Sequence, residues 1–174
     1  MPASTMHAMT RGYAGLRKGR RSLAGHAYLV TFATCKRHPH FSDPVVAFDA
    51  CRWPASGAAW LDARLLAWIL MPDHWHGILQ LGDTQDLSGS VGTAKGRVAR
   101  ALRAKHPQVG TVWQDGFHDR AIRGEAHLLQ AARYIVMNPV RAGIVRRAGD
   151  YPYWDAMWLS GGDRDAGRAH GDRG

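Results

Sequence analysis

Apolar residues gather along the chain in short runs, and the spacing within each run predicts the type of element. Residues 26–34 (HAYLVTFAT) are rich in side chains that favour strands and predict a first strand. Residues 62–71 end in seven consecutive apolar side chains, which indicates a strand buried on both faces. Pro72 and Asp73 suit a two-residue turn, after which residues 74–81 return as an adjacent strand.

Other segments between these strands have the composition of loops and helices. Residues 44–52 predict a short helix, with Ser42 or Asp43 available as its N-cap. Residues 83–92 have the composition of a loop. From there to about residue 106, apolar side chains fall at helical spacing, which predicts a second helix whose other side is basic.

The remaining elements complete the prediction of a fold class. Residues 111–123 are expected to hold one or two short strands, and residues 125–137 a third helix. That helix should stop at Asn138-Pro139, because a residue before proline avoids the right-handed helical region. The order β, α, β, β, α, β, α predicts an α+β fold: a ferredoxin-like sandwich, with a central antiparallel β-sheet and helices packed on it.

Length and composition indicate a single ordinary domain. The chain has 174 residues, of which 45% are hydrophobic, so a sizeable core can form over residues 25–160. We expect a flexible basic arm at 1–24 and a disordered tail at 161–174. Seven apolar residues in a row cannot cross a bilayer, which needs about 20. No signal-peptide pattern is present, and Cys35 and Cys51 are too few for a disulfide scaffold, so we expect a cytoplasmic protein with no membrane association.

Charge points towards nucleic acid. The chain carries 23 Lys and Arg against 14 Asp and Glu, a net charge of +9, and residues 1–42 contain no acid. A basic protein of this size most often binds nucleic acid, although ribosomal and membrane-surface proteins share the signal. A basic helix face is also often merely solvated. The residues of the arm and of the second helix that we expect to contact phosphates are Arg17, Lys18, Arg20, Arg21, Lys95, Arg97, Arg100 and Arg103.

Two histidines one residue apart form the first candidate for chemistry. Residues i and i+2 of a strand point to the same face, so the imidazoles of His74 and His76 should project side by side. Trp75 should then turn into the opposite, packed face. Two imidazoles at this spacing can share a divalent cation, but two incidental histidines on a half-exposed strand would show the same pattern.

The helix expected at 125–137 carries the second candidate. Gln130, Tyr134 and Asn138 follow one another at intervals of four residues and therefore share one face. A tyrosine can attack a phosphodiester when a metal or a base assists it. An ordinary amphipathic tyrosine followed by a helix-stopping Asn-Pro would give the same spacing.

Three segments in a fixed order carry a resemblance to a known family. MPDHWHGILQL, VWQDGFHDRAIR and ARYIVMNPVRAGIV resemble the single-tyrosine transposases of the HUH nuclease superfamily, most closely the REP-associated tyrosine transposases. The resemblance extends over about residues 26–158, and the third segment is the most specific. Two positions depart from the usual pattern: Asp73 stands where Asn is common, and Trp75 is larger than the usual Val or Leu.

The resemblance implies a role for each candidate residue. His74 and His76 would bind a divalent metal, Mg²⁺ or Mn²⁺, and Asn138 would complete the metal site. Tyr134 would be the nucleophile of a transposase, a DNA nucleotidyltransferase with site-specific nicking activity. The implied reaction is metal-dependent cleavage and rejoining of single-stranded DNA at hairpin, REP-like palindromic sequences, through a 5′-phosphotyrosine intermediate.

The resemblance also implies partners and assembly. The partner would be hairpin DNA rather than a small-molecule substrate, in the cytoplasm of a bacterium and associated with the nucleoid. Arg120, Arg123 and Arg141 lie near the implied site and could hold phosphates, although Arg141 could equally cap carbonyls at the helix end. Insertion-sequence relatives are implied to act as dimers that exchange tyrosine helices. The REP-associated group is implied to act as monomers, and we favour a monomer.

Three alternatives fit parts of the sequence. A non-catalytic, domesticated hairpin-DNA-binding protein should have lost His74, His76 or Tyr134, and all three are present. A metal-dependent hydrolase unrelated to DNA should offer further Asp or His ligands at suitable spacing, and none is evident. Replication initiators and relaxases of the same superfamily usually carry additional domains, for which 174 residues leave no room.

Overall fold

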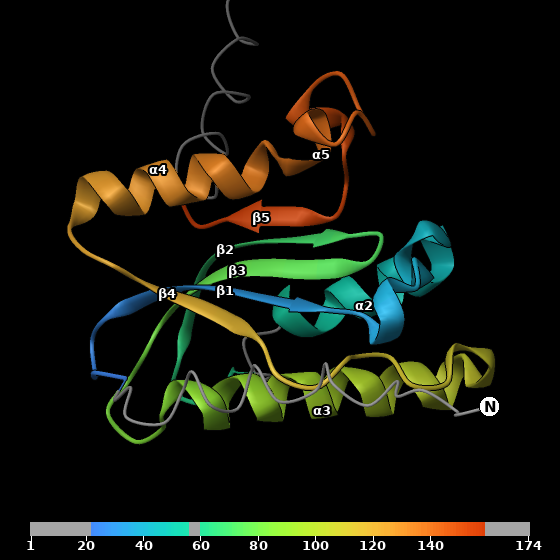
Figure 1. Ribbon diagram of the computed structural model, residues 1–174, viewed down its shortest axis with the longest axis horizontal. Coiled ribbons are helices and arrows are strands. Elements are labelled where there is room, and N and C mark those ends of the chain that lie inside the picture. The colour runs from blue at the N-terminus through green and yellow to red at the C-terminus, as the bar shows by residue number, and fades with distance from the viewer. Residues whose placement is uncertain (1–21, 56–59, 159–174) are drawn as a thin grey trace, which may run out of the picture.

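The structure, a computed structural model, describes residues 22–55 and 60–158. Its strands form one antiparallel sheet in the order β4–β1–β3–β2–β5, with helices on both faces (Figure 1). This confirms the predicted α+β fold and its central antiparallel sheet. The strands are β1 (Ala27–Ala33), β2 (Arg64–Met71), β3 (His74–Gln80), β4 (His118–Ile122) and β5 (Trp154–Ala156).

Helices cover the two faces of the sheet unequally. Helices α2 and α3 share one face, whereas α4 covers the other and leads directly into the short helix α5 (Figure 1). Their bounds are α2 (Pro44–Ala55), α3 (Leu87–Lys105), α4 (Glu125–Val136) and α5 (Asn138–Arg141). The short 3-10 helices are η1 (Cys35–Arg37), η2 (His40–Ser42), η4 (Pro107–Val109) and η5 (Ala148–Asp150).

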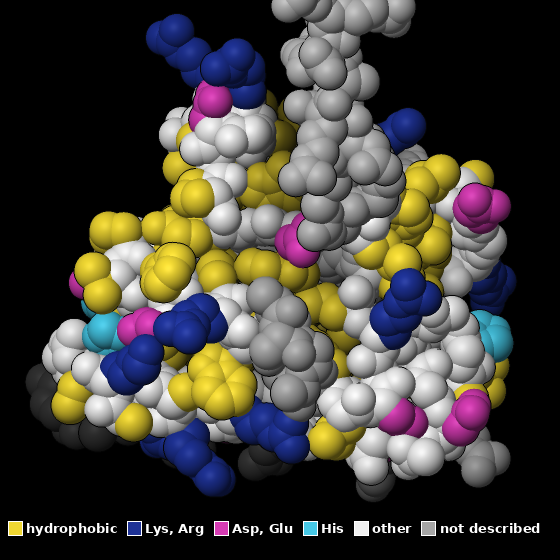
Figure 2. All heavy atoms as spheres, turned by 180° about the vertical axis from the view of Figure 1, so that it is seen from behind, with side chains coloured by type: hydrophobic (Ala, Val, Ile, Leu, Met, Phe, Trp, Pro, Cys, Tyr) yellow, Lys and Arg dark blue, Asp and Glu magenta, His cyan; other side chains and the backbone are white. Residues whose placement is uncertain are grey.

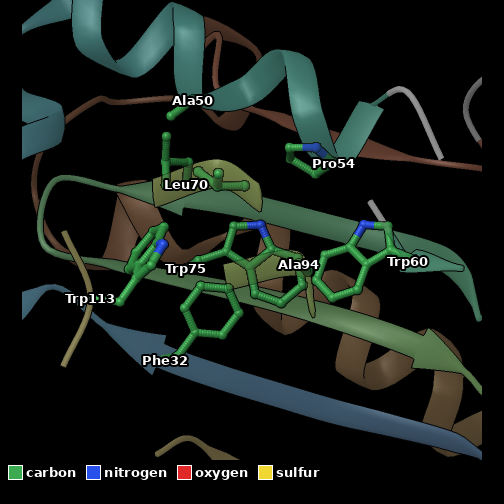
Figure 3. A pocket seen from close by; sticks show the side chains of 9 residues that line it. Phe32, Ala50, Pro54, Trp60, Leu70, Trp75, Ala94 and Trp113 are labelled. Carbon is green, nitrogen blue, oxygen red and sulfur yellow. The ribbon is translucent and has the colours of Figure 1, made fainter. Parts of the chain in front are cut away.

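A separate apolar core fills the space on each side of the sheet. On the α2 and α3 side, the indole of Trp75 lies between Phe32 and Trp60, at ring-centroid distances of 4.9 and 5.1 Å (Figure 3). A Cβ at Gly77 would come within 2.0 Å of that indole, so only glycine leaves room for it. On the other side, buried residues of α4 pack against β2 and β3. Trp75 therefore lies in the core, as its place between two histidines predicted.

Some boundaries differ from those predicted. Helix α3 begins at Leu87 instead of after residue 92, because the Asp86 carboxylate caps it by accepting a hydrogen bond from the Gly89 amide at 2.7 Å. Helix α4 ends before Asn138 as predicted. The chain then continues as α5, because Pro139 lies in the first turn of a new helix, where an N–H is not required. Strand β5, which pairs with β2, was not predicted.

Part of the prediction falls outside the described residues. The expected tail at 161–174 and residues 1–21 of the expected arm belong to that part, so the phosphate contacts predicted for them stay predictions. The residues concerned are Arg17, Lys18, Arg20 and Arg21. Among the residues that the structure does describe, no helix combines the length and apolar character needed to span a membrane.

Candidate active site

The two histidines of β3 face the α4 side of the sheet, opposite to Trp75. Their ring centroids are 4.8 Å apart and the ring planes meet at 89°. His76 Nδ1 lies 2.6 Å from the hydroxyl of Thr31, its direct partner on β1, and His74 Nδ1 lies 2.6 Å from Asp73 Oδ1. Both Nδ1 atoms are therefore engaged, whereas no hydrogen bond joins either Nε2 atom to another described residue.

The environment of His76 keeps its imidazole neutral. Burial lowers the pKa of His76 from 6.5 to about 3, and the nearby His74, Arg141 and Arg37 lower it further, while Asp73 acts in the opposite direction. A neutral imidazole keeps a lone pair on one ring nitrogen. That is the form of histidine that binds a metal ion.

A groove of about 900 Å³ runs between α4 and the strands β1 and β4. His76 lines it from the sheet, and Tyr134 and Gln130 line it from α4. Arg120 on β4 and Arg123 just after β4 form part of its other wall. The groove thus brings together the predicted nucleophile, one predicted ligand and two of the arginines expected near the site.

Arg141 links the tyrosine helix to α5. Its guanidinium carbon lies 3.7 Å from the centroid of the Tyr134 ring, and its Nη2 donates a hydrogen bond to Asn138 Oδ1 at 2.9 Å. Of the two positions considered from the sequence, the side chain of Arg141 therefore takes the one at the site. It also lies close enough to His76 to lower the pKa of that histidine.

The donor set suits a divalent metal, although the chain supplies it without a cluster of acids. Among the described residues, no group of three or more His, Cys, Asp or Glu could hold a metal ion, so a third ligand must be of another kind. Asn138 Oδ1 accepts from Arg141 and retains a second lone pair, while its Nδ2 is buried with no hydrogen-bond partner among the described residues. Two imidazole nitrogens and an amide oxygen are ligands that first-row divalent metals accept.

Comparison with known proteins places the chain in a family. The family model described as "Transposase IS200 like" matches residues 22–138, more than half of the chain. The chain belongs to the IS200-like transposase family. The order of the histidine pair and the tyrosine helix in the sequence had indicated the same assignment.

Relatives within the IS200-like transposase family include REP-associated tyrosine transposases. The chain is 33% identical over 89 residues to the "REP-associated tyrosine transposase" of Escherichia coli (strain K12), covering 50% of each protein. It is 30% identical over 95 residues to a Haemophilus influenzae protein named for the same group. The chain spans about half the length of these curated relatives. The predicted resemblance to REP-associated tyrosine transposases is confirmed.

Solved structures show the same fold. The structure of a REP-associated tyrosine transposase bound to a REP hairpin matches with a TM-score of 0.60 at 20% identity. The match covers 78% of this chain and 79% of that one. A transposase-like protein from Deinococcus radiodurans matches with a TM-score of 0.51 at 24% identity, over 67% of this chain and 93% of that one. At these identities the likeness demonstrates the fold.

The basic face of α3 lies away from the groove. Helix α3 packs on the opposite face of the sheet from α4 (Figure 1), so the exposed side chains of Arg97, Arg100 and Arg103 are separated from Tyr134 by the sheet. Figure 2, which views the molecule from behind, shows Lys and Arg side chains spread among hydrophobic ones instead of gathered in one patch. The predicted phosphate contacts therefore divide between two faces.

Lys95 differs from the prediction. Its Nζ donates hydrogen bonds to the carbonyl oxygens of Gln114 and Gly116, at 2.8 and 2.7 Å, and lies 5.6 Å from the centroid of the Phe32 ring. The ammonium group thus holds the segment before β4 in place. We correct its assignment from a phosphate contact to a structural one.

Sequence reasoning missed three residues of the site. Thr31 is identified only by strand register, because it lies 45 positions from the histidine that it contacts. Arg37 belongs to the acid-free stretch at 1–42, which was the only sequence signal for it. His127 lines the groove one turn before Gln130 and Ala131, so the helical spacing that singled out Gln130 could have found it.

Proposed function

We propose that the chain is a metal-dependent endonuclease and strand transferase, which cleaves and rejoins single-stranded DNA at hairpin, REP-like palindromic sequences. The observation that carries this proposal is the groove that His76 and Tyr134 share, with Arg120 and Arg123 on its other wall. Membership of a transposase family supports a DNA-processing enzyme. A solved protein of the same fold is bound to a REP hairpin, which supports the same class of partner.

Tyr134 would attack the scissile phosphorus. A bond forms between its phenolic oxygen and phosphorus, and the bond between phosphorus and the 3′ oxygen breaks. The phenol loses its proton and the departing 3′ oxygen gains one, so the protons balance. The products are a 5′-phosphotyrosine on Tyr134 and a free 3′-hydroxyl. Attack by a second 3′-hydroxyl reverses the step and joins new strands without an external energy source.

The other residues would hold and polarise the phosphate. A Mg²⁺ or Mn²⁺ ion held by His74, His76 and Asn138 would supply positive charge at a non-bridging phosphate oxygen. Arg141, which contacts both Tyr134 and Asn138, would add a second positive charge beside the attacking phenol. The arginines on the other groove wall would hold flanking phosphates.

We also propose that one copy of the chain forms the complete site. His76 and Tyr134 line the same groove within a single chain, which supports action as a monomer and gives no need for an exchanged tyrosine helix. Light scattering with size-exclusion chromatography should return the mass of one chain, both for the free protein and at the concentration used for cleavage. A dimer of fixed mass under both conditions would contradict this part.

The decisive experiment uses a labelled hairpin oligonucleotide with a single-stranded flank. With Mg²⁺ or Mn²⁺, the protein should nick the flank and leave a covalent tyrosine-linked product, and EDTA should abolish nicking. Tyr134→Phe should form no adduct, whereas Tyr153→Phe, which removes a partly buried hydroxyl outside the groove, should react normally. An adduct that persists in Tyr134→Phe would overturn the assignment. Hairpin binding without any adduct in the unaltered protein would favour the non-catalytic alternative.

A further inference from the structure

The carboxylate of Asp73 is shared between two partners at the edge of the site. Its Oδ1 lies 2.6 Å from His74 Nδ1, and its Oδ2 accepts a hydrogen bond from Arg37 Nη1 at 3.2 Å. The side chain of His74 is 16% exposed and that of Asp73 is 31% exposed, so the first of these contacts is partly shielded from water. The function proposed above gives Asp73 no role of its own.

The backbone holds Asp73 in place. It occupies the turn between β2 and β3, and its carbonyl oxygen accepts hydrogen bonds from the amide and the hydroxyl of Thr34, each at 2.9 Å. Thr34 is completely buried. The carbonyl of Pro72, the other turn residue, accepts from the Phe41 amide at 3.0 Å. With its main chain fixed in this way, the carboxylate has little freedom to leave His74.

An unusual backbone brings Arg37 to the carboxylate. Lys36 and Arg37 have φ angles of 54° and 58°, the left-handed region that residues other than glycine rarely adopt. Strained conformations of this kind persist only where the surrounding structure enforces them, and they cluster at functional sites. Here the Arg37 amide donates to the Thr34 carbonyl at 3.0 Å, and its side chain reaches Asp73.

We propose that Asp73, held by Arg37, is a positioning residue that fixes His74 in the tautomer and orientation presenting Nε2 to the metal. This inference rests on the function proposed above. A carboxylate can only accept a hydrogen bond, so it requires the proton of a neutral His74 to lie on Nδ1 and leaves the lone pair on Nε2. The Thr31 hydroxyl beside His76 can donate or accept, so it imposes no such choice.

Metal affinity and tautomer can both be measured without cleavage. Electron paramagnetic resonance of free Mn²⁺ gives the dissociation constant, and imidazole ¹⁵N–¹H correlation spectra of the metal-free protein at neutral pH give the tautomer of His74. Asp73→Ala should weaken Mn²⁺ binding about 10-fold or more and leave His74 as a mixture of tautomers. Asp73→Asn retains an acceptor oxygen, so it should stay within about 3-fold of the unaltered protein and keep the Nδ1–H form.

Two further variants complete the test. Asp62→Ala removes an equal charge from the segment before β2, at the end of that strand remote from Asp73, and should leave both readouts unchanged. Arg37→Ala should shift the tautomer of His74 in the same direction as Asp73→Ala, but by less. An Arg37→Ala spectrum identical to that of the unaltered protein would remove Arg37 from the proposal.

The outcomes separate this inference from the function on which it rests. Unchanged Mn²⁺ affinity in Asp73→Ala, or an Nε2–H tautomer of His74 in the unaltered protein, would overturn the positioning role. The second result needs no variant and so holds even if Asp73→Ala fails to fold. If Mn²⁺ fails to broaden the resonances of both His74 and His76 in the unaltered protein, the metal site itself is wrong and the proposed function fails with it.

Discussion

The guanidinium of Arg141 lies flat enough against Tyr134 to place its central carbon 3.7 Å from the ring centroid. The same side chain donates to Asn138, so one cation contacts both the predicted nucleophile and the predicted third ligand. A cation over an aromatic face is held by the ring's electrostatic field, and Arg stacks there better than Lys. The tyrosine helix therefore carries its own positive charge to the reacting phosphate.

Loss of Arg141 should slow strand cleavage. Arg141→Ala should lower the single-turnover rate by roughly 10- to 100-fold, because one charge that stabilises the transition state is removed. Arg141→Lys should recover part of the rate, since it restores the charge without the planar stack. Arg147→Ala removes an exposed arginine that pairs with Asp150 and serves as the control. Equal losses in both alanine variants would show that only net charge matters.

Glycine substitutions should have opposite effects at two positions. Gly77→Ala should lower the free energy of unfolding by about 1–3 kcal/mol, because a Cβ would overlap the Trp75 indole. Gly96→Ala should raise it by up to about 1 kcal/mol, because this glycine lies inside α3 with open space around it. Urea unfolding followed by circular dichroism measures both, and a stabilised Gly77→Ala would contradict the packing described here.

Acid should destabilise the metal-free protein through His76. Its pKa is about 3 in the folded chain and near 6.5 in the unfolded chain, so the unfolded state binds the extra proton first. Stability is therefore retained above pH 6.5 and lost as the pH falls towards 3, by up to about 1.4 kcal/mol per pH unit from this group. His76→Gln should show a shallower loss over that range when urea unfolding is repeated at each pH. Parallel pH profiles for the two proteins would exclude this contribution.

The two basic faces should behave differently towards salt. Replacing Arg120 and Arg123 with alanine should reduce the dependence of single-strand binding on salt, by roughly 0.7 in the log–log slope for each lost phosphate contact. Replacing Arg100 and Arg103, on the far face of the sheet, should leave the slope unchanged for an oligonucleotide without a hairpin. Fluorescence anisotropy over a salt series measures both pairs. An equal fall for the two pairs would mean that the strand does not follow the groove.

The sequence predicted the fold well where local pattern and tertiary environment agree. The apolar run of β2 and the alternation in β3 gave both strands and the turn between them. It failed for β5, whose three residues are too short to show a period and which is recognised only through pairing with β2. It placed the start of α3 too late, because the glycines and serines of its first turns have the composition of a loop.

The candidate site divides in the same way. The shared face of His74 and His76 follows from strand geometry alone, and the structure places both on the α4 side. The contacts of Thr31 and Arg37 depend on which strands pair and on two residues with left-handed backbone, and neither property has a local signal in the sequence. Lys95 shows the reverse error, since a basic residue on an amphipathic helix can also serve backbone carbonyls.

Strand β3 has one further consequence. Its side chains alternate between an indole that completes the aromatic core and two imidazoles that face the groove. A slip of one residue against β1 or β2 would turn Trp75 outwards and drive both imidazoles into that core. Such a misfolded chain would lose its stability together with its ligands. Quality control that removes unstable chains therefore also removes those whose histidines point the wrong way.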